Sequence, residues 1–132
     1  MPTAIKLEVR DQDASGILIS LSDLLDRMDL AEVSFWRTRE VDLGGGFLVG
    51  TTVLEFEAMT RNDRGHVMSH DELLQLARAD VQVLDGTFEA FSSSGRLLFT
   101  LLCFDSTLWE ISVEPEHSAL AFQLISRGAI RC

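Results

Sequence analysis

The chain has 132 residues, of which 46% are hydrophobic and 24% are charged, and its formal net charge is −10. This length suits a single domain spanning residues 1–132, and the composition excludes an intrinsically disordered chain, which would carry fewer apolar residues and more charge. The negative charge repels phosphate backbones and so disfavours direct nucleic-acid binding, whereas it attracts a basic protein.

The first residues and the cysteines predict where the protein resides. Residues 1–10 lack the basic and then apolar order of a signal peptide, and the longest apolar run, residues 97–104, is far shorter than a membrane span. The two cysteines, Cys103 and Cys132, have no paired spacing and are expected to be thiols. We therefore expect a soluble cytoplasmic protein without a membrane partner, and its arginine-rich basic set is typical of a high-GC bacterial genome.

The chain begins with a predicted strand and a predicted helix. Apolar and charged residues alternate over residues 5–9, which is the period of a strand with one buried face. Over residues 21–28 four apolar side chains fall on one helical face, and Ser20 or Ser22 is placed to cap the first amides. Three acidic side chains then face water: Asp23, Asp26 and Asp29.

Three consecutive glycines raise the question of a phosphate-binding loop in residues 42–50, DLGGGFLVG. A P-loop requires Gly-Lys-Ser/Thr followed by a helix, and a dinucleotide fingerprint requires glycine at the position of Val49. Residues 33–39 and 49–59 both have strand propensity. The glycines are therefore interpreted as a turn or bulge between two antiparallel strands, with Glu55 and Glu57 on one face of the second.

The second half of the chain predicts two helices and three strands. Ser69 and Glu72 form a capping-box pattern that starts a helix at about residues 70–79, after a polar turn at 61–65 and a loop that holds His66. Strands are expected over residues 81–91, with Asp85–Gly86 as a bulge or turn, over 97–104 as a central strand, and over 108–113. A last helix should follow Glu114–Pro115 and end near Gly128.

These elements predict an α+β fold, in which about three helices pack on one face of a twisted, mainly antiparallel sheet. Short turns join most consecutive strands, and short turns suit antiparallel pairing.

The side chains that could carry chemistry do not form a recognisable catalytic motif. Cys103 is predicted to be a buried strand residue, where the thiolate is disfavoured. His66 and His70 have the spacing of a helical metal pair, but a cap at Ser69 leaves His66 outside the helix. Glu55 and Glu57 are as typical of a solvated strand as of a hydrolase dyad. We predict no catalytic residue, no metal and no cofactor.

The two tryptophans have two interpretations. Trp36 and Trp109 both lie beside charged residues in predicted strands, and both suit packing in the core. Because interfaces are enriched in Trp and Arg, Trp36 with Arg37 could instead anchor a partner.

Residues 104–124, FDSTLWEISVEPEHSALAFQL, complete an order of elements that resembles small bacterial toxin-immunity proteins, over about residues 66–127. The resemblance implies a small, acidic, non-catalytic cytoplasmic protein that neutralises a toxin, often a basic nuclease, by binding it. It carries no binding residue to this chain.

The sequence thus predicts a protein-binding module with a basic partner. Residues 11–59 hold ten acidic residues against three basic ones, so the predicted contact residues come from this region: Asp23, Asp26, Asp29, Trp36, Glu55 and Glu57. The alternatives are a small-molecule-binding domain or enzyme with a pocket between sheet and helices, near Trp36, Trp109 or His66, and a homodimer.

Overall fold

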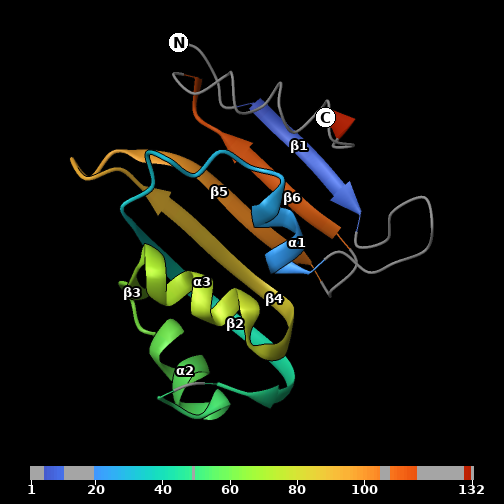
Figure 1. The fold of residues 1–132 in the computed structure, drawn as a ribbon, viewed down its shortest axis with the longest axis vertical. Helices are drawn as coiled ribbons and strands as arrows, with labels where there is room; N and C mark the ends of the chain where they lie inside the picture. Colours follow the sequence, from blue (N-terminus) through green and yellow to red (C-terminus); the bar gives the residue numbers. More distant parts are fainter. Residues whose placement is uncertain (1–4, 11–19, 49, 105–107, 116–129, 132) are drawn as a thin grey trace.

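The computed structural model describes residues 5–10, 20–48, 50–104, 108–115 and 130–131. Within these ranges the chain forms an antiparallel sheet with three helices packed on one of its faces (Figure 1), so the predicted α+β class is confirmed. The strands are β1 (Ile5–Arg10), β2 (Phe35–Phe47), β3 (His66–Ser69), β4 (Asp80–Phe91), β5 (Leu97–Phe104), β6 (Leu108–Val113) and β7 (Ile130–Arg131). The helices are α1 (Leu21–Asp26), α2 (Val53–Thr60) and α3 (His70–Arg78).

The seven described strands follow the order β3-β2-β4-β5-β6-β1-β7. β5 lies in the middle, as its apolar sequence predicts, and every pairing is antiparallel. β1 pairs with β6, about a hundred residues later in the chain, and not with the strand that follows it. This long-range pairing joins the start and the end of the chain in one sheet.

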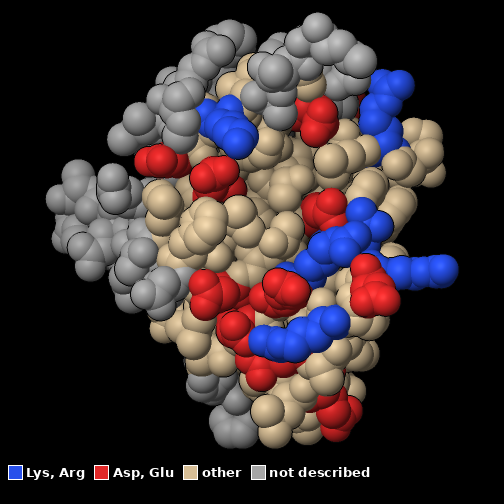
Figure 2. Space-filling model, turned by 180° about the vertical axis from the view of Figure 1, so that it is seen from behind, with Lys and Arg blue, Asp and Glu red and all other residues tan. Residues whose placement is uncertain are grey.

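The register sorts the strand residues onto two faces. Trp36, Ala90, Phe99 and Val113 occupy adjacent positions on β2, β4, β5 and β6, and all four are buried on the helix-covered face. The neighbouring row of Arg37, Glu89, Thr100 and Ser112 lies on the opposite face, which we call the open face. Figure 2 shows the molecule from that side, where acidic and basic side chains lie interspersed among uncharged ones.

The buried apolar side chains form one cluster between the sheet and the helices. Each helix contributes to it: Leu21, Leu24 and Leu25 from α1, Phe56 from α2, Leu73 and Leu76 from α3. Burying a side chain of this size contributes about 1.5–3 kcal/mol relative to leaving it exposed. The cluster therefore fixes the three helices against the covered face.

Two of the predicted helix starts are confirmed, and of the two caps predicted for the first helix Ser20 is the one that forms. Ser20 accepts from the Asp23 amide at 3.1 Å while the Asp23 carboxylate accepts from the Ser20 amide at 3.1 Å. Ser69 and Glu72 make the same reciprocal pair at the start of α3. Each capping box satisfies two backbone N–H groups that would otherwise have no partner at the helix start.

The prediction of a strand over residues 49–59 is wrong, because residues 53–60 form α2. Thr52 caps it by accepting from the Glu55 amide at 3.1 Å. β3 pairs with β2 only over Phe35–Thr38, and beyond that stretch α2 packs against the edge of β2. Side chains of α2 there bind the strand's amides: Thr60 Oγ1 accepts from Val41 at 3.1 Å and Glu57 from Leu43 at 2.9 Å.

The glycine-rich segment is not a turn between two strands, since β2 continues through Gly44 to Phe47. Its pairing with β4 is irregular there, with a register shift between Gly44 and Phe47. Of the two predicted interpretations, turn and bulge, the structure therefore agrees with the bulge. A second shift lies between Arg39 and Asp42, opposite Gly86. An added Cβ on Gly86 would approach Val41 Cγ2 to 2.9 Å, which explains why this position needs glycine.

The predicted turn at Asp105–Ser106 and most of the predicted last helix lie outside the described residues. β7 was not predicted. None of the helices in the described ranges has the length and apolar character that crossing a bilayer requires.

Candidate functional site

The first group of predicted contact residues lies on α1 and the turn after it. Asp23, Asp26 and Asp29 are all exposed, as the helical spacing predicts. Asp23 also closes the α1 capping box, and Asp29 Oδ1 accepts from the Ala31 amide at 3.0 Å. Glu32, which follows, is exposed too. We call these four acidic residues the α1 acidic group.

The second group, Glu55 and Glu57, lies on α2 and not on a strand. Glu55 is exposed in the first turn, where a carboxylate interacts favourably with the helix dipole. Glu57 is half-buried, and its carboxylate is engaged by the Leu43 amide. Glu57 therefore holds α2 to β2, and only Glu55 of this pair is exposed.

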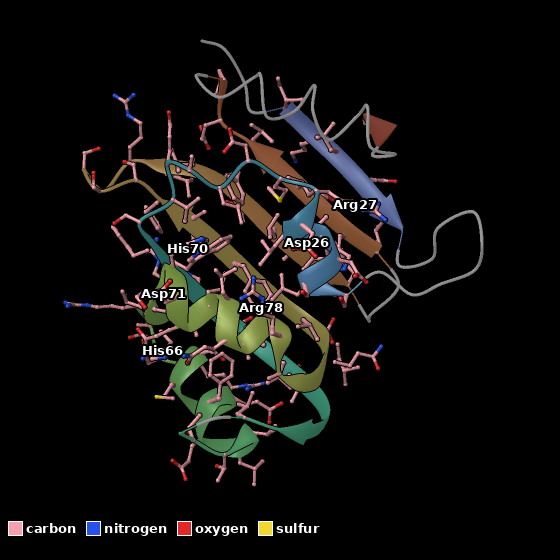
Figure 3. The ribbon with its side chains drawn as sticks, viewed as in Figure 1. Asp26, Arg27, His66, His70, Asp71 and Arg78 are labelled. Carbon is pink, nitrogen blue, oxygen red and sulfur yellow. The ribbon has the colours of Figure 1, made fainter. Side chains whose placement is uncertain are left out.

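The two groups lie apart on the helix-covered side, with α3 between α1 and α2 (Figure 1). The first turn of α3 adds two exposed acidic side chains that are not among the predicted contact residues, Asp71 and Glu72. The acidic first turn was visible in the sequence, and the fold places it at the β3 end of α3, whereas the last turn, with Arg78, lies toward α1 (Figure 3). The side also carries basic residues, since Arg27 directly follows α1 and Arg78 is the last residue of α3 (Figure 3).

Trp36 does not lie on the surface, which corrects its assignment as a partner anchor. Its side chain has 0% exposure, and its indole Nε1 donates to His70 Nδ1 at 3.1 Å. It meets Phe99 edge-on, with ring centroids 5.6 Å apart. Trp109 is buried as well, beside Phe88, so core packing is the confirmed interpretation for both tryptophans.

His66 lies in β3 and not in a loop, whereas His70 is the first residue of α3. The two imidazoles thus belong to different elements, and Nδ1 of His70 is engaged by Trp36. In the described part of the chain, no three His, Cys, Asp or Glu side chains are grouped closely enough to share a metal ion.

A cleft of about 330 Å³ opens between α2, β3 and α3. Its apolar lining comes from Leu48, Phe56, Met59, Met68, Leu76 and Ala79, and its polar lining from Thr51, His66, Glu72 and Gln75. Figure 3 shows His66 between α3 and α2. Its ring meets the buried Phe56 ring edge-on, with centroids 5.9 Å apart. The small-molecule alternative predicted a pocket near Trp36, Trp109 or His66. Of these three residues, only His66 lines this cleft.

Glu72 supplies the cleft with a carboxylate that stays ionised. The pKa of Glu72 is lowered first by the hydrogen bond from the Ser69 amide and next by the one from the Ser69 side chain. Slight burial opposes this shift, and the charge of His66 adds to it. One carboxylate oxygen, Oε1, accepts from the Ser69 amide at 2.9 Å.

The open face has its own charged cluster. Glu89 accepts from Arg37 at 2.8 Å and from Arg39 at 2.9 Å, and Arg37 lies over the Phe91 ring, 5.2 Å from its centroid. Burial disfavours the ionised carboxylate, but the two guanidinium groups outweigh it, so the pKa of Glu89 is lowered. All members of this cluster are engaged with one another, which indicates a structural role.

Cys103 lies on the covered face with 2% exposure, and its Sγ is 3.6 Å from the Leu84 carbonyl oxygen. A thiol in such surroundings is not accessible to a substrate, in agreement with the prediction of a core residue.

Comparison with protein-family models, with curated proteins and with solved structures finds no match to this chain. Its function has to be inferred from its own residues.

Proposed function

We propose that this protein is a non-catalytic protein-binding module that binds a basic protein through its helix-covered side. Neutralisation of a basic toxin is the most specific version of this proposal. The observation that carries it is the α1 acidic group, in which Asp23, Asp26 and Asp29 are exposed on α1 and the turn after it.

The charge of the whole chain favours such a partner. A net charge of −10 on 132 residues attracts a basic protein over distances up to about the Debye length, roughly 8 Å at physiological ionic strength. Attraction of this kind raises association rates and rejects partners of like charge. Glu55, Asp71 and Glu72 add exposed carboxylates in the first turns of α2 and α3, and Arg78 lies between Asp71 and Asp26 (Figure 3).

Binding would act by occupying the basic surface that the partner uses for its own ligand. If that ligand is a nucleic acid, exposed carboxylates take the positions of phosphates and block access without any chemical step. The open face has a different character, because its best-formed charges pair with one another and leave a net positive charge: Arg37 and Arg39 share the single carboxylate of Glu89. We therefore assign the contact to the helical side.

Affinity capture from the organism that encodes the protein, followed by mass spectrometry, tests the proposal. The expected result is a small set of basic proteins that is lost at high salt. Recovery of copies of this chain alone would favour the homodimer and contradict the proposal. A gene for a large toxin beside this gene supports the immunity version, and absence of any such gene removes that version only.

The second candidate function is small-molecule binding in the cleft between α2, β3 and α3. Its volume of about 330 Å³ lies within the range of ligand sites, and its lining combines apolar walls with His66 and Gln75. Thermal unfolding in the presence of a metabolite library tests this alternative, since a ligand that binds only the folded state raises the midpoint.

A further inference from the structure

The cleft between α2, β3 and α3 has the size and lining for one long side chain. Its volume of about 330 Å³ is near the lower limit for sites that enclose a drug-sized ligand. Met59 and Met68 line it from α2 and β3, and Leu76 lines it from α3. Methionine side chains are flexible and polarisable, so walls of this kind adapt to an inserted aliphatic chain.

The carboxylate of Glu72 determines which group the end of such a side chain must carry. Glu72 lines the cleft, is exposed, and remains ionised because Ser69 lowers its pKa. Its Oε1 is engaged by the Ser69 amide, and Oε2 is the atom that an incoming donor would meet. An aliphatic chain that ends in a cation satisfies both the apolar walls and the carboxylate.

We propose that the cleft binds an arginine side chain of the basic protein partner. This inference rests on the proposed function and adds to it the place where the partner is anchored. Arginine fits better than lysine because its flat guanidinium group can donate to Oε2 of Glu72 and also stack on a ring, here the half-buried ring of His66, which lines the cleft. A buried arginine at the centre of an interface is a common source of binding energy.

Methionine methyl signals allow a direct test with a peptide in place of the partner. The sequence has four methionines, Met1, Met28, Met59 and Met68, and two of them line the cleft. Met28 is in the core, so its methyl signal reports that the fold is intact. The probe is the blocked tripeptide Gly-Arg-Gly, and its control is the same peptide with citrulline, which keeps the shape of arginine but has no charge.

The arginine peptide should shift the Met59 and Met68 methyl signals at millimolar concentrations and leave Met28 unchanged. The substitution Glu72→Gln retains a side chain that can complete the capping box and removes the charge. It should lower the affinity for the arginine peptide about two- to fivefold. Glu110→Gln on the open face makes the same change of net charge, and it should leave the affinity unaltered.

No shift, equal shifts with citrulline, or equal weakening by Glu110→Gln would overturn the assignment of the cleft. The natural partner is absent from this test, so its outcome is separate from that of the capture experiment. A cleft that binds the peptide while capture yields no basic protein would overturn the proposed function alone. Capture of a basic protein by a chain whose cleft ignores the peptide would overturn this inference alone.

Discussion

The indole Nε1 of Trp36 donates a hydrogen bond to Nδ1 of His70 across 3.1 Å, and this bond joins β2 to the first residue of α3. Because an indole nitrogen only donates, Nδ1 of His70 must accept, and the ring proton of the neutral imidazole lies on Nε2. The two rings are nearly parallel, with an interplanar angle of 11°. His70 thus completes the core beneath α3 and is not available as a metal ligand through Nδ1.

Replacing His70 with Ala should destabilise the protein by about 1–3 kcal/mol, because the fully buried Trp36 N–H loses its acceptor. Urea unfolding measures the loss. In a Trp36→Phe background the same His70→Ala change should cost clearly less, since no N–H is left without a partner. An equal cost in both backgrounds would show that the hydrogen bond contributes nothing.

Thr60 is the second buried connection on which the fold depends. Its hydroxyl accepts from the Val41 amide at 3.1 Å and donates to the Glu57 carbonyl at 2.8 Å, and the residue has 0% exposure. Thr60→Val, which keeps the shape, should cost about 1–3 kcal/mol in chemical denaturation because a buried strand amide is left unpaired. Thr60→Ser retains the hydroxyl and should cost less. If Ser and Val prove equally destabilising, α2 does not protect the edge of β2 in this way.

Gly65 should be intolerant of a side chain. It has φ +68°, and an added Cβ would lie 2.8 Å from the carbonyl oxygen of Thr38. Gly65→Ala combines backbone strain with this clash and should cost about 2 kcal/mol or more. Gly95 is the matched control, since its φ is +83° but nothing lies within 4 Å of the added atom. Gly95→Ala should cost about 1 kcal/mol in the same thermal unfolding assay. Equal costs at the two sites would argue against the close approach at Gly65.

Glu89 should make stability depend on pH in the acid range. Its pKa in the folded protein is below the ordinary value of 4.5, so its ion pairs contribute fully above that pH and are lost as the pH falls through the folded pKa. Glu89→Gln removes the titrating group. The stability difference between wild type and Glu89→Gln should therefore be constant near neutrality and shrink below about pH 4.5. A difference that grows on acidification would contradict the assignment.

The parts of the fold that local chemistry specifies could be predicted from sequence. Ser20 and Ser69 start helices because their own neighbours, Asp23 and Glu72, complete the capping boxes. The central position of β5 followed from its apolar composition. α2 could not be predicted, because the preference of residues 49–59 for strand is overridden by contacts with β2, above all those of Glu57 and Thr60.

The candidate site was predicted in part. The exposure of Asp23 and Asp26 followed from helical spacing, whereas Asp29 is exposed in the turn after α1. The cleft could not be foreseen, because His66, Met59 and Glu72 come from three elements that only the tertiary fold brings together. For Trp36 the sequence left two interpretations open, because an aromatic residue beside charged ones suits an interface as well as a core. The hydrogen bond to His70, which only the tertiary fold brings near, supports the core interpretation.

The measurement that tests the central claim most directly compares the binding of two neutralised variants to a captured basic partner by calorimetry. Asp26→Asn with Asp29→Asn removes two charges from the α1 acidic group, and Glu8→Gln with Glu110→Gln removes two from the open face, where these residues are cross-strand neighbours. Helix-side binding predicts about a tenfold or greater loss of affinity for the first variant and less than about a twofold loss for the second. Equal losses, or a larger loss for the open-face variant, would contradict the claim that the helix-covered side makes the contact.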